Sequence, residues 1–186
     1  MTSLARHLAP ALLACAALTV PAAASAAAPC ANAGLVPSGA NVAQVKTATL
    51  CLLNVQRRSH RLAPLSANAQ LGKSAQSFSA NMVRRHFFDH VSPSGSTLSS
   101  RVRGTTYLRG NISTWSLGEN IAWGSSDLAT PREIVRSWMH SAGHRQNILR
   151  RGFRHIGVGV AIGAPEDVGA EPAATYTTDF GSRVLR

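Results

Sequence analysis

The sequence predicts an α+β fold in which helices come first and an antiparallel sheet is completed by the last strands. The clearest helix is expected at 68–85, where Leu71, Ala75, Phe78 and Met82 are spaced by four, three and four residues and therefore share one face. The segments 156–162 and 173–180 are rich in β-branched and aromatic residues, which favour strands. Runs of helix followed by paired strands are typical of this fold class.

The remaining elements follow from local signals. Thr130 before Pro131, with Glu133 three residues later, predicts a helix start with a capping box. Gly143 is expected to end that helix. The glycines of 156–162 indicate that another element packs closely on that strand. Further elements are expected as a leader at 29–41, a helix at 42–58, a turn at 92–95, a short helix at 97–103, an extended segment at 117–124 and one or two helical turns at 144–151.

The first 26 residues have the features of a secretory signal peptide. A short segment with Arg6 precedes an uncharged apolar run, and Ala24-Ser25-Ala26 offers a small-residue cleavage site. The run is too short to span a bilayer, so we expect a secreted protein without a transmembrane anchor. The domain division is then 1–26 signal peptide, 27–49 leader and start of the first helix, and 50–182 folded domain.

Export determines how the cysteines are interpreted. Cys15 leaves with the signal peptide, so the mature chain retains Cys30 and Cys51. Two thiols in an oxidising compartment predict one disulfide. A nucleophilic Cys51 is the alternative, but its leucine neighbours disfavour a thiolate.

The chain is strongly basic, with a net charge of +11 over 186 residues. Such a charge favours contact with anionic polymers or surfaces and says nothing about fold. Aromatic residues make up 5 % of the chain and no nucleic-acid module pattern is present, so we expect no nucleic-acid partner. An exported protein meets phosphate-rich wall polymers and anionic lipids instead, although most of these arginines are expected to be solvated surface charge.

Four titratable residues lie in apolar surroundings that predict burial: His90, Glu119, His144 and Asp179. A buried charge needs a partner or a metal. Two imidazoles and one carboxylate form a common zinc set with a fourth position for water, so zinc is the expected metal. The alternative is a hydrogen-bonded polar cluster that holds loops together without metal. His86 and His140 are expected to be surface residues.

Together these pieces resemble the CAP superfamily (cysteine-rich secretory proteins, antigen 5 and pathogenesis-related proteins), also called the SCP domain, in its compact bacterial branch. The matching segments occur in the family's order from Leu50 to Gly181. They are Leu53-Asn54-x-x-Arg57, Leu62-x-Pro64-Leu65, Leu71-x-x-x-Ala75, Met82, Phe87-Phe88-x-His90, Ser92-Pro93-x-Gly95, Gly118-Glu119-Asn120-Ile121-Ala122, Trp138-x-x-Ser141-x-x-His144-Arg145-x-Asn147-Ile148-Leu149, Ile156-Gly157-Val158-Gly159 and Tyr176 through Phe180-Gly181.

The resemblance implies an α-β-α sandwich, in which a small antiparallel sheet lies between helical layers, and a cleft lined by His90, Glu119 and His144. Ser141 stands where many eukaryotic relatives have a second glutamate, which places any mechanism with two carboxylates in doubt. Asn54, Arg57, Asn120, Trp138 and Ser141 match the family's structural motif.

The resemblance leaves open whether the protein is an enzyme. The leading hypothesis is a secreted monomer whose cleft binds a divalent metal and an anionic or lipid-like ligand of the cell envelope. One alternative is a metal-dependent hydrolase or peptidase with Glu119 as general base. The other is a sterol or lipid carrier without catalysis.

Overall fold

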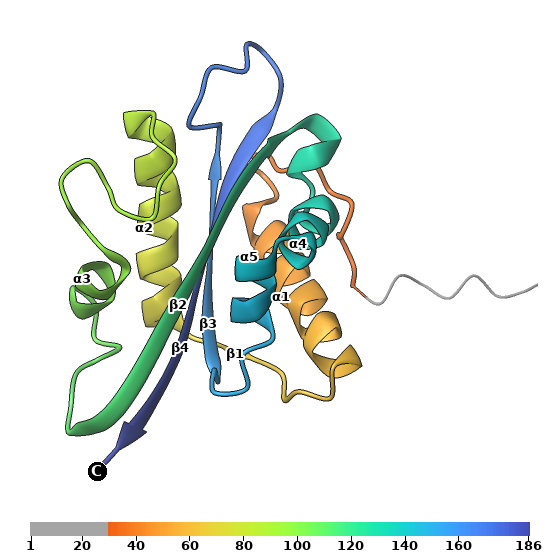
Figure 1. Cartoon of the computed structure of the whole chain (residues 1–186). Helices are drawn as coiled ribbons and strands as arrows, with labels where there is room; N and C mark the ends of the chain where they lie inside the picture. Colours follow the sequence, from red (N-terminus) through yellow and green to blue (C-terminus); the bar gives the residue numbers. More distant parts are fainter. Residues whose placement is uncertain (1–29) are drawn as a thin grey trace, which may run out of the picture.

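A computed structural model describes residues 30–186 of the chain; the expected signal peptide and its cleavage site therefore lie outside the described residues. The element order agrees with the sequence analysis (Figure 1). The elements are α1 (Val42–Ser59), β1 (Ser66–Ala67), α2 (Ala69–Arg85), α3 (Leu98–Arg103), β2 (Ile112–Ser125), the 3-10 turn η1 (Ser126–Ala129), α4 (Pro131–His140), α5 (Ala142–Ile148), β3 (His155–Ile162) and β4 (Ala173–Leu185).

The sheet has four strands in the order β1-β3-β4-β2, so β2 forms one edge. The three long strands are antiparallel, as expected. The two-residue β1, which was not expected, pairs in parallel with β3 and makes the sheet as a whole mixed. Nothing in the loop sequence around Ser66 and Ala67 signals a strand, since so short a segment carries no periodicity.

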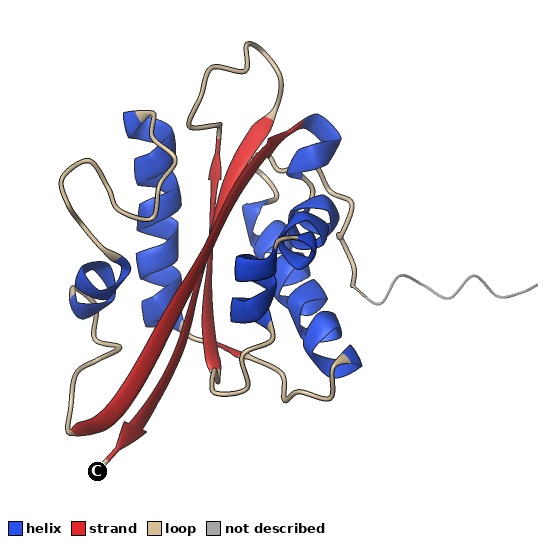
Figure 2. Cartoon of the chain, viewed as in Figure 1, coloured by secondary structure: helices blue, strands red, loops and turns tan. Residues whose placement is uncertain are grey.

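Helices cover both faces of the sheet and confirm the sandwich (Figures 1 and 2). One face carries α2 and α3, and the other carries α1, α4 and α5. The larger core lies under α1 and α4, where Trp138, Phe153 and Tyr176 are fully buried. On the α2 side, Phe78, Met82 and Ile121 form a smaller apolar cluster.

Close packing of α2 on β3 depends on two glycines. A Cβ at Gly157 would lie 2.0 Å from the backbone of Leu71, and one at Gly159 would lie 2.2 Å from the backbone of Ala75. The sequence expectation that an element packs closely on this strand is confirmed. Gln76 then ties α2 to β3 directly, since its side-chain amide donates to the Val160 carbonyl and accepts from the Val160 N–H.

The α4–α5 boundary differs from the expectation. Thr130 caps α4 and accepts a hydrogen bond from the Glu133 N–H, as expected. The other half of the capping box does not form, because the Thr130 N–H donates to Asp127 and the Glu133 side chain pairs with Arg136. The helix ends at Ser141, in extended conformation, and Gly143 lies within α5 rather than ending α4. Glycine is a common helix terminator but not an obligatory one, and here an extended Ser141 breaks the helix first.

The predicted disulfide joins Cys30 to Cys51. It ties the leader to α1, and the leader also accepts a hydrogen bond at the Ala33 carbonyl from the Arg132 N–H at the start of α4. Cys30 is buried, so the leader is part of the fold.

We predict that Gly159→Ala destabilises the fold by about 2 kcal/mol, because the added methyl group forces α2 and β3 apart. Gly72→Ala in α2 is the matched control: a Cβ there meets nothing within 4 Å, and removing a helical glycine should stabilise by up to about 1 kcal/mol. Urea denaturation measures both values. Equal stabilities for the two variants would show that the contact between α2 and β3 can relax.

Candidate functional site

The site is built around Glu119 in the middle of edge strand β2. Glu119 pairs in register with Asp179 of β4, and its side chain is only 3 % exposed. The carboxylate is held on the side of the sheet covered by α2 and α3, since its partners come from α3 and from the loop after α2. Burial confirms the sequence expectation and requires that the charge be compensated.

Arg101 of α3 supplies that compensation. Its Nη2 donates to Glu119 Oε2 at 2.5 Å, and its Nη1 donates to the carbonyls of His90 and Ser96 at 3.2 and 2.9 Å. The guanidinium also lies 3.4 Å from the centre of the Phe78 ring. The sequence analysis missed Arg101; the available signals were its place on a short predicted helix and the need of Glu119 for a cation.

His90 occupies the other oxygen of Glu119. Its Nδ1 lies 2.8 Å from Oε1. The hydrogen bond to Glu119 is the main reason that the pKa of His90 is raised, and burial opposes it only in part. The expectation that His90 is buried is wrong, because 54 % of its side chain is exposed. Phe87 packs against Phe78, but Phe88 is already 43 % exposed, so the loop turns outward before His90. Glu119 thus contacts only one of the two ring nitrogens of His90.

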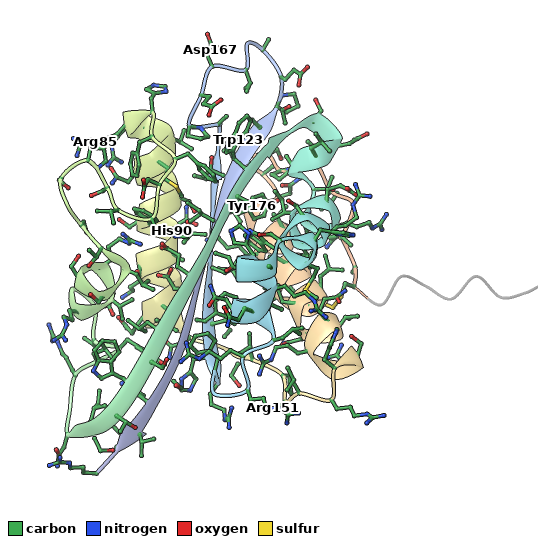
Figure 3. The ribbon with its side chains drawn as sticks, in the orientation of Figure 1. Arg85, His90, Trp123, Arg151, Asp167 and Tyr176 are labelled. Carbon is green, nitrogen blue, oxygen red and sulfur yellow. A yellow bond between two sulfur atoms is a disulfide. The ribbon has the colours of Figure 1, made fainter. Side chains whose placement is uncertain are left out.

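His144 approaches from the other helical layer, on α5. The pKa of His144 is lowered, first by burial and then by the positive charge of His90. No hydrogen bond joins the His144 ring to Glu119 among the described residues. The structure therefore brings His90 and Glu119 into direct contact and leaves His144 as a neighbour across the edge strand (Figure 3 shows His90 beside β2).

A network of side-chain hydrogen bonds fixes α5 against β2. The Asn120 side-chain NH2 donates to the His144 carbonyl at 3.1 Å, and its oxygen accepts from Asn147 at 2.9 Å. Asn147 also donates to the Glu119 carbonyl, and the Trp138 indole donates to the Ile121 carbonyl. A Cβ at Gly118 would lie 2.8 Å from Phe153 and 3.0 Å from Asn147, which explains the glycine of the Gly-Glu-Asn motif.

Arg57 anchors the far end of α5. It is fully buried, and its guanidinium donates to the carbonyls of Ala63, Ile148, Arg150 and Phe153. A cation suits the carbonyl end of a helix because the helix dipole is negative there. Asn54 fixes the preceding loop by exchanging two hydrogen bonds with the Leu65 backbone. Ser141 forms the break between α4 and α5.

Asp179 is a second buried carboxyl next to Glu119. Burial is the main cause that raises the pKa of Asp179 well above its ordinary value, and the negative charge of Glu119 adds to it. Ser74 and Glu119 face this carboxyl, although neither makes a hydrogen bond of ordinary geometry to it among the described residues. The expectation that Asp179 is buried is confirmed.

This arrangement does not suit a divalent metal. Both oxygens of Glu119 are engaged, one by a guanidinium and one by an imidazole. In residues 30–186 no group of three or more His, Cys, Asp or Glu side chains could hold a metal ion. A zinc ion on Glu119 would have to displace Arg101 or share the carboxylate with a like charge. His86 and His140 are exposed, as expected.

Comparison with known proteins places these features in a family. The model of the cysteine-rich secretory protein family, CAP, matches residues 50–178. The chain belongs to the CAP family. The match begins at the residue expected for the folded domain and contains His90, Glu119 and His144.

Individual relatives agree with this assignment. The protein YkwD of Bacillus subtilis (strain 168) is 41 % identical over 108 residues, which are 58 % of this chain and 39 % of YkwD. The crystal structure of an extracellular protein containing a SCP domain from Bacillus anthracis has a TM-score of 0.56 and 25 % identity, covering 78 % of this chain and 44 % of that one. This CAP chain thus spans less than half the length of both relatives.

The fold extends to more distant proteins. An outer surface protein from Borrelia burgdorferi has a TM-score of 0.56 at 16 % identity, covering 73 % of this chain and 90 % of that one. At this identity the likeness concerns the fold alone. No helix in the described part of this CAP protein is long and apolar enough to cross a membrane.

We predict that Glu119→Gln lowers the free energy of unfolding by about 3 kcal/mol, because it leaves the guanidinium of Arg101 without its counterion in a buried place. Glu133→Gln is the matched control, since Glu133 pairs with Arg136, whose side chain is 64 % exposed; exposed pairs contribute less than about 1 kcal/mol. Denaturant unfolding distinguishes them. A loss for Glu119→Gln no larger than that for Glu133→Gln would contradict the role given to the buried pair.

Proposed function

We propose that this protein is an extracellular CAP-domain binding protein whose cleft takes an anionic ligand of the cell envelope through His90 and His144. The observation that carries the proposal is the engagement of both Glu119 oxygens by Arg101 and His90. The hydrogen bond to Glu119 raises the pKa of His90 and so favours its charged form, and more than half of that side chain faces solvent. A fixed, exposed cation favours an anion.

The charges around the cleft support an anionic ligand. The charge of Arg101 balances that of Glu119, and burial favours the neutral form of Asp179. A ligand that approaches therefore meets the His90 imidazole beside the exposed carboxylate of Asp89, whose charge also raises the pKa of His90. The net charge of +11 increases the local concentration of polyanions at the surface.

The two other hypotheses are supported less well. A hydrolase with Glu119 as general base needs a free carboxylate oxygen within reach of water, whereas both oxygens are engaged here. A lipid carrier needs a largely apolar cavity. An apolar groove next to Lys46 and Val158 has a volume of about 400 Å3, but it lies along β3, which is separated from the strand of Glu119 by β4.

Binding of a phosphate polymer tests the proposal. Poly(glycerol phosphate) and vesicles of phosphatidylglycerol serve as probes for a wall polymer and a lipid surface. His90→Ala should weaken binding of the preferred probe about tenfold at pH 6, the effect of losing one hydrogen bond to a charged group, whereas His140→Ala should leave it unchanged. Isothermal titration measures both. Equal affinities of the two variants for both probes would overturn the proposal.

The same binding should depend on pH in a defined direction. Because the pKa of His90 is raised, its charge persists at higher pH than that of an ordinary histidine and is lost as pH rises through that pKa. Binding should therefore be strongest at low pH and weaken as pH rises through the folded pKa of His90. The ring signals of His90 in an NMR titration report that pKa, and the two midpoints should coincide.

Zinc titration separates this proposal from the metal hypothesis. We expect the wild type to bind zinc no tighter than about 1 mM, equivalent to roughly −4 kcal/mol, because Arg101 occupies the cation position at Glu119. Arg101→Gln should bind zinc more tightly than the wild type, and Arg103→Gln, on the same helix, should not. Micromolar binding by the wild type that is lost in both His90→Ala and His144→Ala would establish the metal site instead.

A further inference from the structure

A second pocket lies between α2 and α3, lined by residues that do not contact the exposed ring of His90. Its volume is about 450 Å3. Gln70, Lys73, Ser74 and Ser77 face it from α2 at spacings of three, one and three, and Arg101 and Thr105 close it from the other side. Among the described residues that line it there is no carboxylate and no large apolar side chain. The pocket therefore offers hydroxyl groups, the ammonium of Lys73 and a guanidinium whose charge is balanced by Glu119.

Two polar atoms at its wall have no hydrogen-bond partner among the described residues. Ser74 is 4 % exposed and its Oγ is unpaired; Arg101 has Nε unpaired, while its Nη atoms are committed to Glu119, His90 and Ser96. Asp179, whose carboxyl faces Ser74, is likewise without a bond of ordinary geometry. Nearly all buried polar groups in proteins are satisfied by protein, water or ligand. These atoms indicate that a polar molecule approaches the wall.

We infer that this pocket binds a small oxyanion, a phosphate or the phosphate of a phosphomonoester. Lys73, which is exposed at the mouth, provides a mobile point charge, and the hydroxyl of Ser77 provides a neutral donor. The Thr105 hydroxyl lines the pocket but donates its proton to the Val102 carbonyl. Arg101 adds the N–H of Nε, which has no hydrogen-bond partner among the described residues, whereas the charge of its guanidinium is balanced by Glu119. An ammonium, a guanidinium N–H and a hydroxyl in a lining without carboxylates suit phosphate oxygens.

The site is separate from the cleft proposed above, although both border Arg101. Ligands in the cleft meet His90 on the exposed side of Glu119, whereas an anion in the α2–α3 pocket meets Lys73 and Ser77, which belong to α2. The two sites can therefore be tested with different variants. The inference does not depend on the proposed function, since neither Lys73 nor Ser77 takes part in it.

Titration with inorganic phosphate tests the pocket, with backbone amide shifts followed by NMR on the full secreted protein. We expect phosphate to shift the amides of Ser77 and Thr105, and Lys73→Gln to weaken that response at least about fivefold, the effect of losing one charged partner. Ser77→Asp places a carboxylate on an exposed position of the pocket and should abolish the response. Lys46→Gln is the matched control, because Lys46 is the only other lysine and lies on α1.

His90→Ala distinguishes the two sites. If the pocket binds phosphate, the shifts at Ser77 and Thr105 persist in His90→Ala and disappear in Ser77→Asp, whatever happens at the cleft. The inference is overturned if Lys73→Gln and Lys46→Gln respond equally, or if the wild-type shifts are confined to the residues around His90. In the second case the cleft alone binds phosphate, and the proposed function stands without the pocket.

Discussion

The buried carboxylate of Glu119 is the constraint from which most of the site follows. A charge on a strand that is covered by helices has to be neutralised in place. The chain meets this need with α3, a helix of six residues capped by Thr97 that carries Arg101 over the Phe78 ring and onto Glu119. The loop that carries His90 is held by the same arginine through a backbone carbonyl. One carboxylate thus organises a helix, a loop and the exposed imidazole.

In the opposite helical layer, backbone carbonyl groups take the place that the buried carboxylate of Glu119 has on the α2–α3 side. Arg57 donates to four backbone carbonyls, of which three, those of Ile148, Arg150 and Phe153, lie at the end of α5 and in the segment that follows it. Asn120 and Asn147 join the other side of α5 to β2. His144 is carried on this helix, so its position relative to His90 is set by contacts that involve neither imidazole. His90 and His144 are therefore carried by two layers that are braced independently of each other.

Much of this architecture could be predicted from the sequence. The apolar stripe of α2, the cap at Thr130, the glycines of β3 and the pair Cys30–Cys51 are local signals, and each is confirmed. The pairing of Arg101 with Glu119 could not be predicted, because a contact between residues far apart depends on the packing of α3 and leaves no periodic trace. The exposure of His90 was missed for a similar reason, since apolar neighbours in sequence do not fix the direction of a loop. The strand β1, which pairs in parallel with β3, has only two residues and is too short to leave a pattern in the sequence.

The position of β2 at the sheet edge has a consequence for self-association. An edge strand of this length presents a row of unpaired peptide groups that can recruit a strand from another molecule, which is a route to aggregation. Here the side chains of Asn147 and Trp138 take up the outward carbonyls of Glu119 and Ile121, so an incoming strand would find those acceptors already occupied. The same residues that join α4 and α5 to β2 thus also protect the chain from polymerising through its own sheet, and removing either side chain would free a carbonyl for an incoming strand.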